Sequence, residues 1–259
     1  MGLNEEQIER YSRQIILPHI GSKGQEKLLA ARVLVIGLGG LGSPVAVYLA
    51  RAGVGTLGLV DSEKVELSNL HRQIIYSSDD IGKEKALVAK EKLQRANPDV
   101  EVKEHVMRVS SDNILDVIRD YDIIVDGSDN FPARYLINDA CVLAKKPMVH
   151  GGVFRFDGQA MVIKPGEGPC YRCVFPDPPP PGAIPSGQEA GVLGALAGVI
   201  GLIEATETLK LILGIGEPLI GRLIIYNSLK MSFRQVKVPK DEHCPICGEK
   251  PTIFRPRAY

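Results

Sequence analysis

A glycine-rich turn between an apolar strand and a helix constrains the fold of this chain more than any other feature. The β-branched run at residues 33–36 leads into Gly37, Gly39 and Gly42, which follow the G-x-G-x-x-G spacing, and residues 43–52 have the pattern of a helix. Glycines in this turn let the backbone turn tightly and approach phosphate groups. The N-terminus of the following helix offers the phosphates free N–H groups. The pattern predicts the first unit of a nucleotide-binding α/β fold.

An acidic residue follows at the position that such a fold requires. A second strand is predicted over residues 56–60, and Asp61 comes directly after it. The separation between Gly42 and Asp61 is close to the about 20 residues at which an acidic side chain reaches the ribose hydroxyls. A glycine turn used only for packing remains the alternative, but the strand, the helix and the acid in register favour nucleotide binding.

The rest of the chain predicts a Rossmann-like, mostly parallel sheet flanked by helices, with an antiparallel C-terminal extension. Strands at 101–106, 123–125 and 147–150 alternate with helices at 113–119 and 132–144, and short helices are expected over 4–16 and 24–31. Antiparallel strands are expected over 158–163 and 222–238, with an apolar helix at 189–213 between them. The prolines of segment 175–186 exclude both helix and central strand there, which predicts a crossover loop.

A length of 259 residues suits one large domain. We expect a single unit over 1–259, with N-terminal helices at 1–32, a nucleotide-binding half at 33–150 and a second half at 151–259. The 31 basic residues balance the 31 acidic ones, which argues against a nucleic acid partner. The polar N-terminus lacks a secretion signal, and the apolar run at 190–203 is shorter than the about 20 residues of a membrane span, so we expect a cytoplasmic protein.

Cationic side chains follow the second strand, which separates this chain from a nicotinamide enzyme. Arg72 lies in the segment Ser68-Asn69-Leu70-His71-Arg72-Gln73, and Lys83 and Lys85 precede the next helix. Stabilising a triphosphate during reaction at its α-phosphorus needs such cations, whereas hydride transfer does not. The alternative is a solvated helix face that carries Lys83, Lys85, Lys90 and Lys92.

Two C-x-x-C pairs predict a metal site. Cys170, Cys173, Cys244 and Cys247 can complete one tetrahedral zinc shell, which leaves no open position and makes the zinc structural. A redox pair or unligated core cysteines are the alternatives, and His243 could replace one ligand. The remaining Cys141 lies in an apolar helical pattern and is expected to be a core residue.

Seven blocks in order along the chain resemble one family, the ubiquitin-activating-like adenylyltransferases of the ThiF, MoeB and HesA group, and within it the molybdopterin-synthase adenylyltransferases. The blocks are Arg10-Tyr11-Ser12-Arg13-Gln14-Ile15, GLGGLGSP at 37–44, Leu67-Ser68-Asn69-Leu70-His71-Arg72-Gln73, Gly127-Ser128-Asp129-Asn130, Cys170-Tyr171-Arg172-Cys173, Glu189-Ala190-Gly191-Val192 and Cys244-Pro245-Ile246-Cys247.

The resemblance implies an enzyme that binds Mg-ATP and adenylates the C-terminal Gly-Gly carboxylate of a β-grasp sulfur carrier, releasing pyrophosphate. It makes the half at 151–259 the carrier-binding and zinc-containing one. Arg13 would reach the phosphates from the partner subunit of a homodimer, as an arginine finger does. Asp126 is the rival to Asp129 for Mg²⁺. The other implied assignments are the turn glycines Gly37, Gly39, Gly40 and Gly42, Asp61 on the ribose, Asn69, Arg72 and Lys85 on the phosphates, Asp129 on Mg²⁺, and Asn130 as a further cofactor-binding residue.

Two features bear on the reaction that the resemblance implies. Some relatives carry a sulfur-handling or thioester cysteine on the crossover loop, where this chain has Gly187, so we expect the enzyme to stop at the acyl-adenylate. His71 and His150 are expected to be structural, because an ionised carboxylate needs no general base.

The function predicted is therefore adenylation of a sulfur carrier, with molybdopterin biosynthesis as the first choice of pathway. Thiamine, thiolated-tRNA or cysteine biosynthesis is the alternative within the class. A catalytically silent nucleotide-binding scaffold and a nicotinamide dehydrogenase are the alternatives outside it. Arg13, Arg72, Lys85 and Asp129 together argue against the scaffold, since a silent protein has no physical need for all four.

Overall fold

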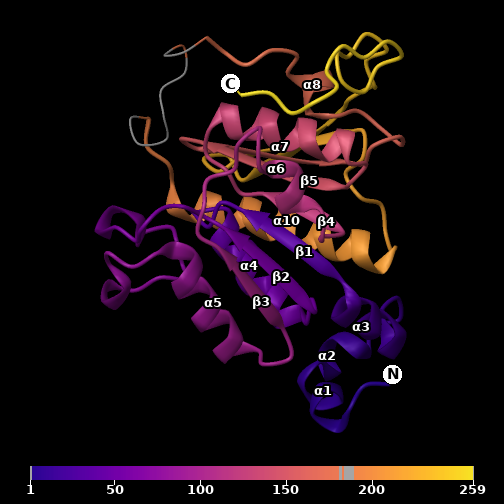
Figure 1. Cartoon of the computed structure of the whole chain (residues 1–259). Coiled ribbons are helices and arrows are strands. Elements are labelled where there is room, and N and C mark those ends of the chain that lie inside the picture. The colour runs from indigo at the N-terminus through magenta and orange to yellow at the C-terminus, as the bar shows by residue number, and fades with distance from the viewer. Residues whose placement is uncertain (1, 181–182, 184–189, 259) are drawn as a thin grey trace.

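The computed structural model describes residues 2–180, 183 and 190–258, and its centre is one eight-stranded sheet in the order β3-β2-β1-β4-β5-β6-β7-β8 (Figure 1). The strands are β1 (Arg32–Ile36), β2 (Thr56–Val60), β3 (Glu101–His105), β4 (Ile123–Asp126), β5 (Met148–Phe154), β6 (Asp157–Ile163), β7 (Arg222–Asn227) and β8 (Ser232–Lys237).

Helices connect and cover the strands. They are α1 (Glu5–Arg10), α2 (Ser12–Ile15), α3 (Gly21–Ala30), α4 (Gly42–Ala52), α5 (Lys85–Ala96), α6 (Ile114–Ile118), α7 (Phe131–Leu143), α8 (Tyr171–Val174) and α10 (Gly194–Leu213), with short 3₁₀ turns η1 (Leu67–Asn69) and η2 (Ser78–Asp80).

The five strands β1 to β5 are parallel, as the alternation of strands and helices predicts. Both faces of these strands are apolar, because Val33 and Val35 pack under α4 on one face while Leu34 and Ile36 face the α6–α7 layer on the other. The chain order reverses between β1 and β4. Ligands of doubly wound sheets bind at this reversal, outside the carboxyl ends of the strands.

The second half extends the same sheet, as predicted. β6 pairs antiparallel with β5 and with β7, and β7 pairs antiparallel with β8. β5 continues to Phe154, four residues beyond the predicted end, because residues 151–154 pair with residues 157–160 of β6.

The apolar helix is shorter than predicted, and the prediction that it starts at residue 189 is wrong over residues 191–193. Gly191 has a φ of +76°, Val192 bridges to Arg155, and the Leu193 N–H donates to the Arg155 carbonyl at 3.0 Å. This extended segment forms a short backbone pairing that a helix would prevent, and α10 begins at Gly194. Residue 189 lies outside the described residues.

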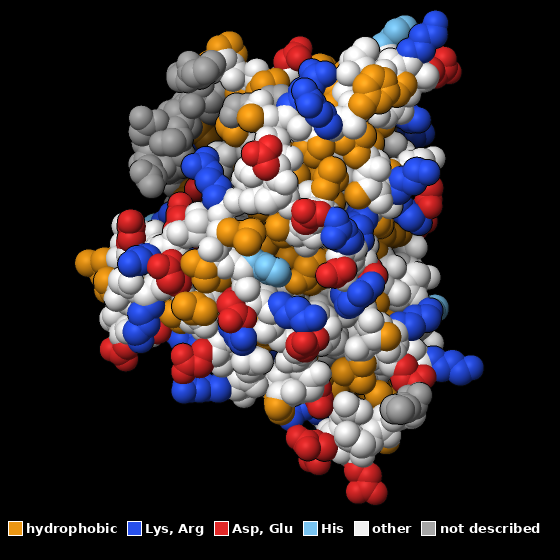
Figure 2. Space-filling view, viewed as in Figure 1, with side chains coloured by type: hydrophobic (Ala, Val, Ile, Leu, Met, Phe, Trp, Pro, Cys, Tyr) orange, Lys and Arg blue, Asp and Glu red, His pale blue; other side chains and the backbone are white. Residues whose placement is uncertain are grey.

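The two ends of the molecule carry different elements (Figure 1). α1 to α3 gather at one end, and α8 with the C-terminal segment forms the other. Acidic and basic side chains mix over the face shown in Figure 2, in keeping with the balanced charge. None of the helices in the described ranges combines the length and apolar character that crossing a membrane requires.

Candidate active site

The glycine turn joins β1 to α4 at the carboxyl edge of the parallel strands. Gly37 has a φ of +89°, a conformation that favours glycine, and a Cβ added at Gly42 would lie 1.8 Å from the Gly37 carbonyl oxygen. The turn also meets the end of β4, since a Cβ on Gly37 would lie 2.8 Å from the Gly127 carbonyl oxygen. The backbone of β1 and β4 therefore leaves no room for side chains at these two positions.

Asp61 ties the end of β2 to the turn. Its carboxylate accepts from the Leu38 N–H at 2.8 Å and from the Glu63 N–H at 2.8 Å. The Tyr76 hydroxyl donates to the Leu38 carbonyl at 3.2 Å, so the turn is held on both sides. Burial raises the pKa of Asp61, and the two backbone hydrogen bonds oppose that shift.

Lys85 is not part of a solvated helix face, because it is 2% exposed. Its ammonium donates to Glu63 at 2.6 Å, and its charge acts on Asp61. The pairing with Glu63 was not predicted, although an acid two residues past Asp61 was a visible sign of it. Lys83 is 61% exposed at its side chain. Lys90 and Lys92 pair with Glu104 and Asp80. The alternative that these four lysines form a solvated helix face is therefore wrong for Lys85, the only buried one among them.

Asn69 and Arg72 lie in the segment after β2, and Arg72 approaches the turn. A Cβ added at Gly40 would lie 3.4 Å from the Arg72 side chain, so this guanidinium stem packs against the glycine turn. Arg72 donates to the Ser68 carbonyl at 3.0 Å, and Asn69 accepts from the Glu66 N–H at 3.1 Å. Arg72 thus contacts the turn directly, whereas the charge of Lys85 acts on Asp61, which is bonded to the turn.

Asp126 and Asp129 differ sharply in their surroundings. Asp126 is fully buried, and its two oxygens accept from Ser128 and His150. Asp129 is exposed, and one oxygen accepts from Asn130 at 3.3 Å. Asn130 caps α7 by accepting from the Ala133 N–H at 3.0 Å. Of the two rivals, Asp129 has a carboxylate that a magnesium ion can reach.

Arg13 does not join these residues within the chain. It is exposed on α2, and the adjacent Gln14 donates to the Ala52 carbonyl, at the C-terminal end of α4. The glycine turn lies at the other end of this helix, about 16 Å away at 1.5 Å per residue. Arg13 therefore lies away from the glycine turn of its own chain.

Two buried polar atoms beside the turn have no hydrogen-bond partner in the described structure. They are Ser43 Oγ at the start of α4 and Gln73 Oε1, and the Gln73 amide nitrogen would lie 3.7 Å from a Cβ on Gly39. Leaving a buried polar group unpaired is costly, so orphaned atoms beside a glycine turn point to a ligand that satisfies them.

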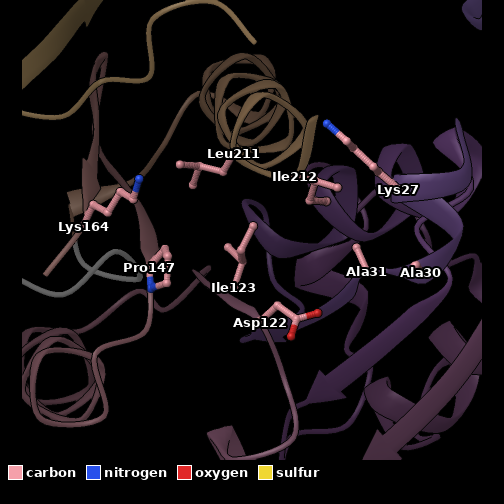
Figure 3. Close-up of a pocket in the computed structure, with 9 residues that line it drawn as sticks. All are labelled: Lys27, Ala30, Ala31, Asp122, Ile123, Pro147, Lys164, Leu211 and Ile212. Atoms are coloured by element: carbon pink, nitrogen blue, oxygen red, sulfur yellow. The ribbon is translucent and has the colours of Figure 1, made fainter. Parts of the chain in front are cut away.

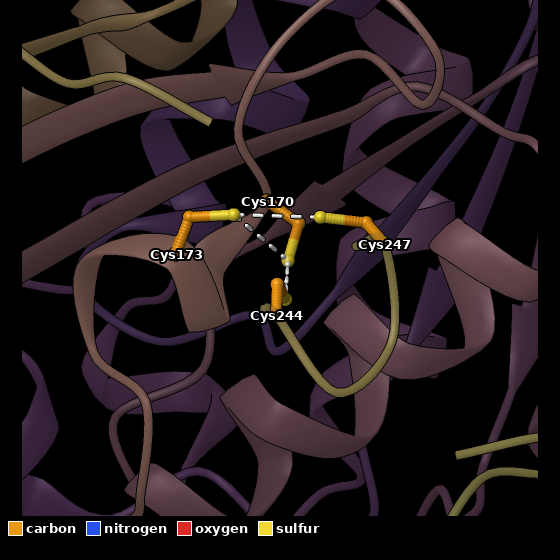
Figure 4. A group of neighbouring side chains, drawn as sticks. All are labelled: Cys170, Cys173, Cys244 and Cys247. Carbon is orange, nitrogen blue, oxygen red and sulfur yellow. Dashed lines mark hydrogen bonds between the residues drawn. The ribbon is translucent and has the colours of Figure 1, made fainter. Parts of the chain in front are cut away.

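The four predicted metal ligands meet in space (Figure 4). Their sulfur atoms lie within 4.8 Å of one another, with Sγ–Sγ distances of 3.6 Å for Cys170–Cys244 and 3.4 Å for Cys173–Cys247. A tetrahedral site with Zn–S bonds of about 2.3 Å has sulfur atoms about 3.8 Å apart, so these cysteines fit zinc. The side chain of His243 is 95% exposed and is not needed as a ligand.

Two further predictions have definite outcomes. Cys141 is fully buried in the α6–α7 core, and burial raises the pKa of its thiol far above the usual range, as expected for an inert core residue. The predicted crossover loop is confirmed over its described residues, 175–180 and 183, which form neither helix nor strand, whereas Gly187 lies outside the described residues.

A cavity of about 430 Å³ opens elsewhere on the molecule (Figure 3). Ala31, Asp122 and Pro147 line it at the amino ends of β1, β4 and β5, opposite the glycine turn. Its lysines are already engaged, since Lys27 donates to the Leu213 carbonyl and Lys164 pairs with Glu167. The cavity is therefore separate from the candidate active site.

Curated relatives resemble the whole chain. It is 52% identical to the sulfur carrier protein adenylyltransferase of Thermus thermophilus over 97% of this chain and 95% of the relative. It is 48% identical to the probable adenylyltransferase/sulfurtransferase MoeZ of Mycobacterium tuberculosis, over 95% of this chain but 64% of that longer protein.

The fold is shared with solved structures. The crystal structure of E. coli MccB with ATP matches 92% of this chain and 73% of that one, with a TM-score of 0.79 and 26% identity. The ThiF family model matches residues 11–246, which include the glycine turn, Asp61, Asp129 and three of the four clustered cysteines. The chain belongs to the ThiF family.

Proposed function

We propose that this protein adenylates the C-terminal carboxylate of a ubiquitin-like sulfur carrier at the expense of ATP. The observation that carries the proposal is a glycine turn after β1 that the Arg72 side chain contacts and that Asp61, beside Lys85, holds by a hydrogen bond to Leu38. The backbone of Gly127 and Ser128, just before Asp129, approaches the same turn. The name of the Thermus relative supports the carrier as substrate, and the MccB complex supports ATP.

The residues suit in-line displacement at the α-phosphorus. One oxygen of the carrier carboxylate attacks this phosphorus, the bond to the bridging oxygen of the β-phosphate breaks, and pyrophosphate leaves. A C-terminal carboxylate is ionised at pH 7, so no side chain has to remove a proton. Catalysis then rests on positioning and on cations that neutralise the phosphoryl oxygens and the departing pyrophosphate.

Each residue has a part in this scheme. Asp61 holds the ribose, and Lys85, Arg72 and Asn69 hold the phosphates, with Lys85 exchanging Glu63 for the triphosphate. Asp129 is the ligand for Mg²⁺, which supplies charge neutralisation at the phosphates. Arg13 of a second subunit supplies a further cation. The cysteine cluster holds a structural zinc ion.

The first test is ATP–pyrophosphate exchange with purified protein, Mg²⁺ and a panel of Gly-Gly-ended carriers. We expect exchange with one carrier, and its identity names the pathway, molybdopterin biosynthesis being the first choice. Asp129→Ala should abolish exchange while Asp112→Ala, a change of another exposed aspartate, should leave it intact. Absence of exchange with every carrier despite ATP binding would favour a silent scaffold. A melting temperature raised by NAD(H) and not by ATP would favour a dehydrogenase.

Lys85 and Lys83 form a matched pair for the electrostatic part of the proposal. Lys85→Ala should lower the exchange rate by about 100-fold or more, the usual cost of one positioned charge at a reacting centre. Lys83→Ala removes an exposed lysine two residues away and should change the rate little. Steady-state exchange kinetics compare the two. Equal losses would mean that Lys85 acts through general surface charge.

A further inference from the structure

A buried chain of hydrogen bonds runs from β5 to the loop that carries Asp129. His150 Nδ1 lies 2.8 Å from Asp126 Oδ2, and Asp126 Oδ1 accepts from the Ser128 N–H at 3.1 Å and from the Ser128 hydroxyl at 2.6 Å. His150 and Asp126 are fully buried, and Ser128 is 7% exposed. The acceptor is a carboxylate, so Nδ1 carries the proton.

This series of hydrogen bonds ends next to Asp129. Ser128 directly precedes it, and Asn130 directly follows it as the cap of α7. The loop 127–130 is thus tied at one end to β4 and β5 and at the other end to α7. Asp129 alone between these ties has an exposed carboxylate.

The imidazole of His150 is itself held in place. Its ring centroid lies 4.8 Å from that of Tyr171 in an edge arrangement, and the Gln159 amide lies 3.5 Å from Nε2. Burial lowers the pKa of His150, and the hydrogen bond to Asp126 opposes that shift. A neutral ring with a fixed orientation can hold a carboxylate at a defined place without adding charge to the core.

We propose that His150 is a positioning residue that fixes the Asp129 carboxylate for magnesium through Asp126 and Ser128. The inference rests on the proposed function, because it assigns a device to the same site. Residues behind a metal ligand orient it, and their loss commonly costs about 10- to 100-fold in metal affinity.

The test compares His150→Asn with His150→Gln. An asparagine amide lies at the position of Nδ1 and can donate to Asp126, whereas a glutamine amide lies one bond farther out, at the position of Nε2. His150→Gln should raise the Mg²⁺ concentration for half-maximal exchange about tenfold, with the KM for the carrier unchanged. His150→Asn should restore the wild-type Mg²⁺ dependence. A purely structural role would lower activity or stability without moving this dependence.

A second readout does not need activity. Hydrogen exchange followed by mass spectrometry reports on the Ser128 N–H, which Asp126 protects in the unliganded protein. We expect faster exchange in the peptide containing residues 127–130 for His150→Gln and wild-type protection for His150→Asn. Ser128→Ala removes one hydroxyl at the end of the hydrogen-bond chain. It should also raise the Mg²⁺ concentration for half-maximal ATP–pyrophosphate exchange, and it covers the case in which a His150 variant does not fold.

The outcomes separate the two proposals. One outcome is carrier-dependent ATP–pyrophosphate exchange in the wild type, with the Mg²⁺ dependence and the hydrogen-exchange protection unchanged in His150→Gln and Ser128→Ala. It would overturn the positioning role and leave the proposed function standing. No ATP–pyrophosphate exchange in the wild type, together with the expected pattern of hydrogen-exchange protection, would overturn the proposed function and keep the coupling of His150 to the loop.

Discussion

The carboxyl group of Glu204 on α10 is fully buried, and neither of its oxygens has a hydrogen-bond partner in the described structure. It lies against the backbone of β5, since a Cβ added at Gly151 would be 2.4 Å from the carboxyl group. Burial, and then the charge of Asp126, raise the pKa of Glu204 well above its ordinary value. A carboxyl group in such a place favours its neutral form.

This burial predicts a pH-dependent effect of Glu204→Gln on stability. Below the unfolded-state pKa of about 4.3, both proteins hold a neutral group and should melt at similar temperatures. At higher pH the unfolded wild type loses the proton that the folded protein retains, so the wild type loses stability and the variant does not. The melting temperature of Glu204→Gln should exceed that of the wild type by a margin that grows from about pH 5 to pH 8.

Melting curves of the same preparations across this pH range measure the margin. Glu217→Gln, which changes a side chain that is 89% exposed, should show no such trend. A Glu204→Gln protein that is less stable at every pH would mean that the carboxylate is charged and paired in the folded state.

At the scale of single elements, α10 joins the nucleotide half to the extension. It packs on α4, and Cβ atoms added at Gly194 and Gly201 would each lie 2.6 Å from a backbone oxygen, of His71 and Leu41 respectively. The small residues of this helix thus serve close packing on the segments around the active site. Substitution of these small residues of α10 by larger ones is therefore expected to displace the segments around the glycine turn.

The proposed zinc site predicts an effect of metal removal on the second half. A bound ion at 100 times its Kd contributes about 2.7 kcal/mol. Each kcal/mol moves the melting temperature of a chain of this size by about 2–4 °C. Cys244→Ser, or chelation of the wild type, should therefore lower the melting temperature by about 5–10 °C and reduce the zinc content.

Metal analysis and melting curves check this together. His243→Ala should keep one zinc ion per chain and the wild-type melting temperature, because its side chain is exposed. Full zinc content in Cys244→Ser would contradict the four-cysteine site.

Local patterns predicted most elements, and they failed where a distant partner decides. β2 was predicted with both of its ends, because an apolar run followed by an acid marks a strand edge. The start of α10 was missed because Val192 pairs with Arg155, and the sequence pattern of the helix does not contain that partner. The clustered cysteines were predictable because spacing alone identifies them. The ion pair of Lys85 with Glu63 and the contact of His150 with Asp126 depend on the completed sheet.

At the scale of the whole molecule, the proposed action of Arg13 on the site of a second subunit predicts complementation between inactive chains. Arg13→Ala and Asp129→Ala should each be inactive alone, since one lacks the cation donated to the partner and the other lacks the metal ligand. In a mixed dimer, one of the two sites receives both residues intact. Equal mixing after dissociation should therefore restore about a quarter of wild-type exchange activity.

Exchange assays on the mixed and separate proteins measure this recovery. A mixture of Asp129→Ala with Lys85→Ala is the control, because both residues belong to the same side of the site and no mixed dimer has an intact one. Absence of recovery in the Arg13 mixture would place the action of Arg13 within its own chain or remove it from catalysis.

The order of the strands also bears on how the chain folds. The β5–β6 and β7–β8 hairpins join strands two and four residues apart in the chain, whereas the amino end of β1 meets Asp122 across 90 residues. Closing a long loop costs more entropy before any contact compensates it, so local hairpins form early and distant parallel pairings form late. The nucleotide site lies at the junction of β1 and β4. Affinity for ATP is therefore expected among the last properties that the newly made chain acquires.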